Sequence, residues 1–196
     1  MANYRAVYSV GNAIARFLND HYPPQELKNQ PVFDCNFRLI SSHDIASEDA
    51  QNLDKVVSVF LHRITRNEQV RTASRAPDRA DAQPLLFLDL HYLITYWGSS
   101  AEAEQVILTW VMQQLESNPV LDSSTLSGAD GSTSESVQLV PTNLSLEDIL
   151  RIWDALGPKY RLSVSYIARY ARVDRIVPAA GPVVATRFKV EDQVGQ

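Results

Sequence analysis

Residues 85–96 are the strongest constraint on the fold, because this segment is apolar on both sides when it is drawn as a strand. One face is unbroken and consists of Leu86, Leu88, Leu90, Tyr92, Ile94 and Tyr96. The opposite face carries Asp89 and His91, but also Leu85, Phe87 and Leu93. Such a strand occurs at the centre of a sheet that is covered on both faces. We therefore expect a layered fold.

Other apolar patterns predict the elements that surround this strand. Apolar residues three and four positions apart indicate helices over residues 3–22, 101–116 and 146–156. Ser99 with Glu102, and Ser145 with Asp148, have the spacing of helix N-terminal caps. Alternating or β-branched segments predict strands over residues 32–40, 55–65, 137–140 and 162–173. The predicted fold class is α/β or α+β, with a mixed sheet flanked by helices.

Polar segments divide the chain into one domain and a tail. Residues 41–54 and 71–83 are rich in turn-forming and charged residues, and we expect loops there. Residues 117–136 are rich in Ser, Gly, Asp and Thr, which predicts an exposed loop inserted in the domain. We therefore place one domain at 1–175 and a C-terminal arm at 176–196, in which residues 183–190 have the composition of a strand.

Composition and charge narrow the class of protein. The chain has 196 residues and 45% of them are hydrophobic, which is too apolar for a disordered protein. Its 18 basic and 23 acidic residues give a net charge of −5, which argues against a general nucleic-acid binder. We see no secretory signal and no apolar run of the roughly 20 residues that a membrane helix needs, so we expect synthesis in the cytoplasm and no membrane insertion.

No catalytic motif is apparent. The four histidines lack the spacing of a metal site, and no nucleotide-binding glycine loop or nucleophile elbow occurs, so we assign no catalytic, cofactor or metal residues. Asp89 and His91 share a strand face and could form a carboxylate–imidazole pair, although a structural polar patch is the simpler interpretation. Cys35, the only cysteine, is more typical of an inert apolar position than of a nucleophile.

Two groups of residues are candidates for a partner interface. The first is a group of four arginines that comes closest to forming a basic patch and that could contact an acidic protein: Arg63, Arg66, Arg71 and Arg75. The second is the apolar side of the arm, which could add as a strand to the edge of a neighbouring protein: Val183, Val184, Phe188 and Val190.

Several segments together resemble the tube-terminator, or cap, proteins of bacterial contractile injection systems, which are phage-tail-like particles. Residues 143–157 and the strand that follows them are the most specific part, and the resemblance runs from about residue 4 to residue 175. The segments are 44–46 (DIA), 57–66 (VSVFLHRITR), 86–97 (LFLDLHYLITYW), the predicted helix at 101–115, 137–157 (VQLVPTNLSLEDILRIWDALG) and 160–173 (YRLSVSYIARYARV). No catalytic motif accompanies them.

The resemblance implies a phage tail-terminator-like fold and a structural role without enzymatic activity or cofactors. A cap of this family closes the far end of the inner tube, and of the sheath in some cases, as a homo-hexameric ring. The implied partners are other copies of the chain, the inner tube protein and the sheath protein. The implied location is the cytoplasm of the producing bacterium, within the particle, which is then released or docked at a membrane. Alternatives are a tube or baseplate adaptor of the same particle, a small α/β hydrolase without a known motif, and a peptide-binding module.

Overall fold

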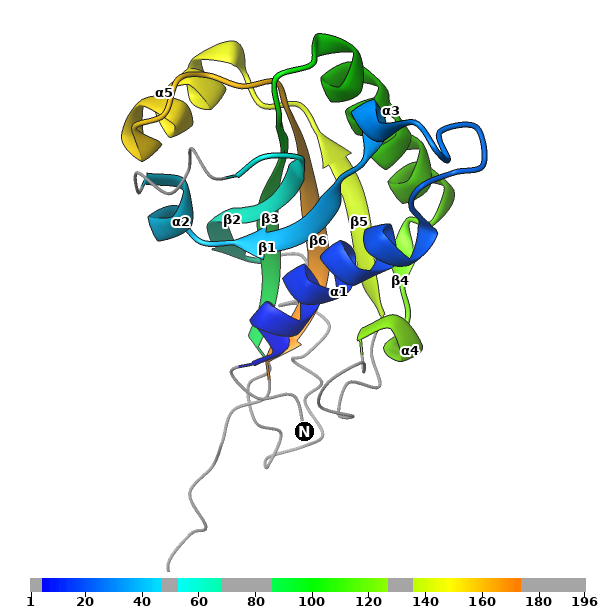
Figure 1. Ribbon diagram of the computed structural model, residues 1–196. Helices are drawn as coiled ribbons and strands as arrows, with labels where there is room; N and C mark the ends of the chain where they lie inside the picture. Colours follow the sequence, from blue (N-terminus) through cyan, green and yellow to red (C-terminus); the bar gives the residue numbers. More distant parts are fainter. Residues whose placement is uncertain (1–4, 47–52, 68–85, 127–135, 174–196) are drawn as a thin grey trace, which may run out of the picture.

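A six-stranded mixed sheet forms the centre of the structure, a computed structural model that describes residues 5–46, 53–67, 86–126 and 136–173 (Figure 1). The strand order is β1-β2-β3-β6-β5-β4. Only β1 and β2 run parallel, and every other neighbouring pair is antiparallel. The strands are β1 (Asn36–Ile40), β2 (Val56–Arg66), β3 (Leu86–Trp97), β4 (Val120–Leu121), β5 (Val137–Thr142) and β6 (Ser163–Val173). The predicted mixed sheet with flanking helices is confirmed.

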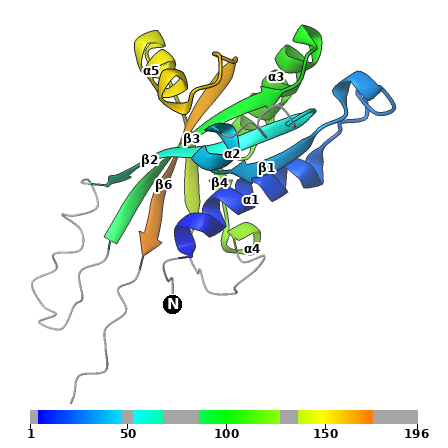
Figure 2. The ribbon, with the colours of Figure 1, turned by 60° about the vertical axis from the view of Figure 1, so that its left-hand side comes forward.

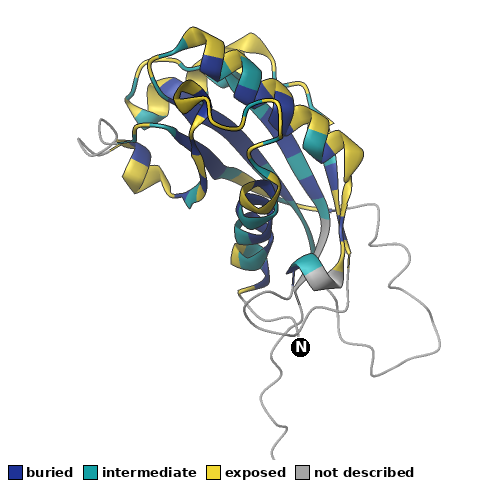
Figure 3. Cartoon of the chain, turned by 45° about the vertical axis from the view of Figure 1, so that its right-hand side comes forward, coloured by how far each residue is buried: buried dark blue, intermediate teal, exposed yellow. Residues whose placement is uncertain are grey.

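Strand β3 has the central position that its two apolar faces predict. It pairs with β2 on one side and with β6 on the other. Leu90, Tyr92 and Ile94 are completely buried on one face, while Leu93 and Trp97 are buried on the other. The strands between the helices are accordingly the most buried part of the molecule (Figure 3).

Two long helices cover the first face of the sheet. They are α1 (Ala6–His21) and α3 (Ala101–Ser117), and their buried sides contribute Ile14, Leu18, Ile107 and Val111. These side chains pack with Val57, Val59, Leu90, Tyr92, Ile94, Tyr96 and their neighbours in one cluster, which we call the α1/α3 core. The short 3₁₀ helix η1 (Pro31–Phe33) adds Phe33 to it. This core is the larger of the two.

The second face is covered only in part. Helices α2 (Ser42–Ala46) and α5 (Leu146–Leu156) lie over the end of the sheet at which β3 finishes (Figure 1). Trp153 of α5 is 5.9 Å from Trp97 of β3, measured between ring centroids. The cluster, called here the α5 core, consists of Ile40, Ile45, Val56, Phe60, Leu93, Trp97 and Trp153. The rest of this sheet face carries polar residues such as Thr65, Asp89 and His91 beside apolar ones such as Ile167.

The structure corrects several expectations from the sequence. The expected loop at 41–54 begins with helix α2, because Ile45 is buried in the α5 core. The expected exposed loop at 117–136 contains β4 and the helix α4 (Ser123–Leu126), since Leu121 and Leu126 are buried in the α1/α3 core. The cap of α3 is Ser100 rather than Ser99, and its Oγ accepts a hydrogen bond from the Ala103 N–H at 3.2 Å.

The predicted strand at 32–40 is also shorter than expected. It starts at residue 36, after η1, so Cys35 precedes the strand. The predicted loop at 71–83, the rest of the expected loop at 127–135 and the arm at 176–196 lie outside the described residues. Within the described part, no helix is long and apolar enough to cross a membrane.

Candidate assembly surfaces

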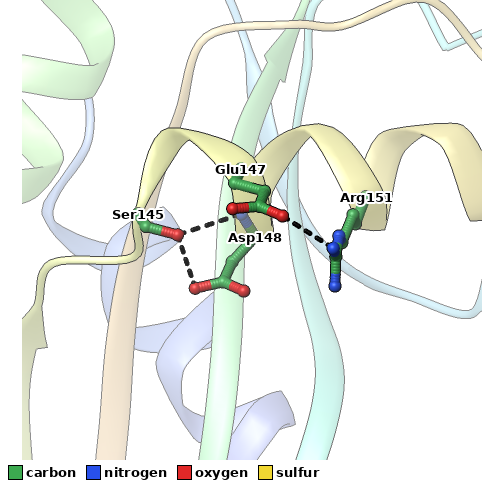
Figure 4. A network of polar contacts seen from close by, with 4 residues as sticks. All are labelled: Ser145, Glu147, Asp148 and Arg151. Carbon is green, nitrogen blue, oxygen red and sulfur yellow. Dashed lines mark hydrogen bonds and ion pairs between the residues drawn. The ribbon is translucent and has the colours of Figure 1, made fainter.

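Helix α5 is built from strong local signals. The Ser145 Oγ accepts a hydrogen bond from the Asp148 N–H at 3.1 Å and donates one to the Asp148 carboxylate at 2.6 Å (Figure 4). Glu147 and Arg151 form an exposed ion pair one helical turn apart, at 2.6 Å. Gly157 ends the helix with a φ of 92°, a conformation that favours glycine. The cap that the sequence predicts at Ser145 is confirmed.

The apolar side of α5 is only partly used by the α5 core. Trp153 is buried and Ile152 and Leu156 are half-buried. Leu146 and Leu150, one turn apart, are 67% and 42% exposed. An eleven-residue helix is marginal in water without packing against an apolar face. The two exposed leucines are therefore candidates for contact with another subunit.

A hollow of about 760 Å³ lies between the end of α5 and the beginning of α3. Tyr160 and Leu162 line it and are themselves largely exposed. Arg161 closes its inner side, where the guanidinium lies 4.9 Å from the Trp97 ring centroid and donates a hydrogen bond to the Gly98 carbonyl at 3.2 Å. This end of the molecule thus combines a hollow with exposed apolar and aromatic side chains, which are enriched in protein interfaces.

The polar part of the second sheet face lies farther along β2 and β3. The strand register pairs Arg63 with His91 and Thr65 with Asp89. Thr65 Oγ1 and His91 Nε2 are hydrogen-bonded at 2.9 Å, and the Asn67 amide donates to Asp89 Oδ1 at 2.9 Å. Burial and the nearby Arg63 guanidinium lower the pKa of His91. Asp89 and His91 are therefore each held by another residue, an arrangement that suits a structural polar patch.

The structure separates the two predicted arginines that it describes. Both side chains are exposed on β2. Arg63 lies opposite His91, on the polar face, whereas Arg66 lies opposite Leu88, which packs against the α1/α3 core. Directly opposite residues share a sheet face, so the two arginines point to opposite sides. The other predicted interface residues lie outside the described ranges: Arg71, Arg75, Val183, Val184, Phe188 and Val190.

Cys35 lies against Tyr22 at the border of the α1/α3 core. The side chain is buried, and burial raises the pKa of its thiol to about 12. At neutral pH the thiol is therefore protonated and weakly nucleophilic. Within the described ranges, no three His, Cys, Asp or Glu residues come together in a group that could hold a metal ion.

Sequence reasoning gave no weight to the exposure of Leu146 and Leu150. Their helical spacing places them with Trp153, and that pattern is the same for a fully buried helix face. The sequence signal for this exposure is the small number of apolar residues elsewhere in the chain that could pack against the helix. The exposed leucines thus emerge from the structure.

The mixed sheet with flanking helices matches the fold of solved tube terminators. The structure is similar to the sheath/tube terminator of PVC, an extracellular contractile injection system, in its extended state, with 25% identity and a TM-score of 0.54. That similarity covers 94% of this chain and 63% of the other. It is also similar to the tube-terminating cap of the anti-feeding prophage, with 21% identity, a TM-score of 0.57 and coverage of 92% and 60%.

The sequence family of the Pvc16 N-terminal domain matches residues 9–186, and the chain belongs to this family. A search of curated protein sequences finds no match. The chain spans less than two thirds of the length of either solved structure. The resemblance to tube terminators and the fold class that the sequence predicts are both confirmed.

Proposed function

We propose that this protein is a structural cap that terminates the inner tube of a contractile injection particle. The observation that carries the proposal is the similarity to a sheath/tube terminator over 94% of this chain. The proposed partners are the tube protein and further copies of the chain, with the sheath protein as an additional contact. One solved relative is a sheath/tube terminator and the other is a tube-terminating cap, which supports these partners.

The proposed assembly is a homo-hexameric ring, as the family resemblance implies. In a cyclic ring, one surface of a subunit meets a different surface of the next, and the closing rotation prevents further growth. Helix α5 supplies a suitable surface, because Leu146 and Leu150 are exposed and the helix itself is firmly capped. The polar face around Arg63 and His91 supplies another of different chemistry.

The proposed role is non-enzymatic and needs no cofactor. The solved relatives are terminators, and the residues with potential chemistry are engaged structurally: Cys35 is buried, while Asp89 and His91 are hydrogen-bonded to Asn67 and Thr65. We propose synthesis in the cytoplasm, without nucleic-acid binding or membrane insertion, followed by incorporation into the particle. The PVC relative belongs to an extracellular particle, which supports its later release.

The test is the length of tubes that form in the presence and absence of this protein. Purified inner tube protein should assemble into tubes of broadly distributed length, and adding this protein should shorten them and place a ring at one end in electron micrographs. Unchanged lengths with bare ends would contradict the proposal. Protein found at the baseplate end of intact particles would instead favour the adaptor function.

A further inference from the structure

Among the described residues, one edge of strand β2 has no partner strand along its second half. Strand β1 pairs with β2 only from Val56 to Phe60 and ends at Ile40. Beyond this point β2 continues to Arg66, paired with β3 alone (Figure 2). Among the described residues, no strand occupies the other side of residues 61–66. An open edge of this kind is a template for another strand.

The register shows which backbone groups face outward. The Asn67 N–H donates to the Phe87 carbonyl at 3.0 Å, so this opposite pair is one of the hydrogen-bonded pairs of the antiparallel ladder. Such pairs alternate with pairs that direct their backbone groups away from each other. By this alternation, the N–H and C=O groups of Ile64 and Arg66 point away from β3. The edge therefore offers donors and acceptors at the spacing of a strand.

A groove of about 770 Å³ begins where β1 ends and includes the start of this edge. Tyr92 and His62 line it, and within the described part of the chain Tyr92 Oη and His62 Nε2 are buried without a hydrogen-bond partner. The Tyr92 side chain is completely buried. Buried polar atoms are nearly always hydrogen-bonded in folded proteins, so these two atoms indicate a missing polar neighbour.

The side chains around the edge suit an amphipathic strand. Ile64 on β2 is 49% exposed and Tyr8, which lines the groove, is 60% exposed. Arg63 and Arg66 add positive charge along the same edge, a common protection against unselective pairing. An added strand should therefore alternate apolar and polar residues and carry acidic groups nearby.

Residues 183–190 of the arm have the alternation, their own charged residues are basic, and two acidic residues follow them. Val184, Thr186, Phe188 and Val190 would lie on one face, with Ala185, Arg187 and Lys189 on the other, and Glu191 and Asp192 follow directly. Strand β6 ends at Val173, opposite Leu86, at the same end of the sheet where Arg66 lies opposite Leu88. Nine residues, 174–182, connect β6 to this segment, and a fully extended connector of that length spans about 30 Å.

We propose that residues 183–190 of one copy add as a strand to the open edge of β2, at residues 61–66, in the next copy of the ring. The proposal rests on the ring of the proposed function. The arm and the edge are different surfaces of one chain, which is what a head-to-tail ring contact requires. Main-chain pairing supplies the affinity, while the groove and the arginines supply the selectivity.

Disulfide trapping between two full-length variants tests this contact. In a Cys35→Ala background, Ile64→Cys protein is mixed with proteins that carry a cysteine at successive arm positions from 183 to 190. We expect disulfide-linked dimers between the two variants, strongest at every second arm position. Thr65→Cys, whose side chain lies on the other sheet face, should select the intervening positions. Met112→Cys, exposed on α3, is the control and should give no periodic pattern.

Absence of the periodic pattern overturns the proposal. A second variant keeps the outcome clear: Ile64→Pro removes an outward N–H without removing a bond to β3, and it should abolish trapping between Thr65→Cys and the arm. Ile64→Thr retains the N–H and should preserve the trapping. The tube-length assay is independent: if tubes are still capped while trapping fails, the cap function stands and this contact is wrong.

Discussion

The hydroxyl group of Ser58 joins two strands inside the α5 core. It accepts a hydrogen bond from the Trp97 indole N–H at 2.9 Å and donates one to the Thr95 carbonyl at 3.2 Å. Both Ser58 and Trp97 are buried. One small polar side chain therefore satisfies the only polar atom of a large buried aromatic residue, and this fixes the position of Trp97 under α5.

Ser58→Ala should lower the free energy of unfolding by about 1–3 kcal/mol, because the Trp97 N–H is left buried without a partner. Urea denaturation at constant pH measures the change. Trp97→Phe removes the donor instead, and the double variant should lose less than the sum of the single losses. Additive losses would show that the two side chains act independently.

His62 makes the stability of the fold depend on pH. Burial, followed by the nearby His91 and Arg63, lowers the pKa of His62 from 6.5 to about 4. As the pH falls below 6.5, the unfolded chain takes up the proton first, so stability is lost between pH 6.5 and about 4. Urea midpoints at pH 7 and pH 5 should differ less for His62→Gln than for the unchanged protein. Equal differences would contradict the assignment.

At the scale of elements, α5 combines a structural side and a free side. The structural side carries Trp153, and the free side carries Leu146 and Leu150. Leu146→Gln with Leu150→Gln preserves helix propensity, so the free energy of unfolding should change by less than about 0.5 kcal/mol. Capping in the tube-length assay should nevertheless be weakened. Met112→Gln, a matched change of a 45% exposed residue on α3, should leave capping intact.

Long elements follow from the sequence because their periodicity is strong. The patterns at 55–65, 85–96 and 146–156 correspond to β2, β3 and α5 within one residue at each end. Helices α2 and α4 and strand β4 have two to five residues, which is too short for a periodic pattern. They exist because Ile45, Leu121 and Leu126 find places in the two cores, and that depends on tertiary packing.

The candidate surface on β2 illustrates a further limit of the sequence. Val57, Val59 and Leu61 face the α1/α3 core, and strict alternation would place Arg63 on that same side. The bulge between Leu61 and Arg63 shifts the alternation, and Arg63 instead lies opposite His91 on the polar face. An extra residue in a strand leaves no mark in the apolar pattern, so only the structure shows which face each arginine occupies.

At the scale of the whole molecule, we expect the sheet and its two cores, which the described residues form, to be stable without the arm. Deleting residues 176–196 should therefore leave the thermal unfolding midpoint nearly unchanged while it weakens self-association. Thermal denaturation and light scattering at matched concentrations measure the two effects. A large drop in the midpoint would show that the arm belongs to the fold of its own subunit.

The arrangement of the described helices and strands gives the molecule two different ends. The start of α1, the end of β2, the start of β3 and the end of β6 lie at one pole, and α5 lies at the other (Figures 1 and 2). Subunits related only by rotation about one axis all point the same way along that axis. A ring of this protein would thus have two sides of unlike chemistry, as a stopper needs: one side that recognises the last layer beneath it and one that presents no equivalent layer to the next arrival.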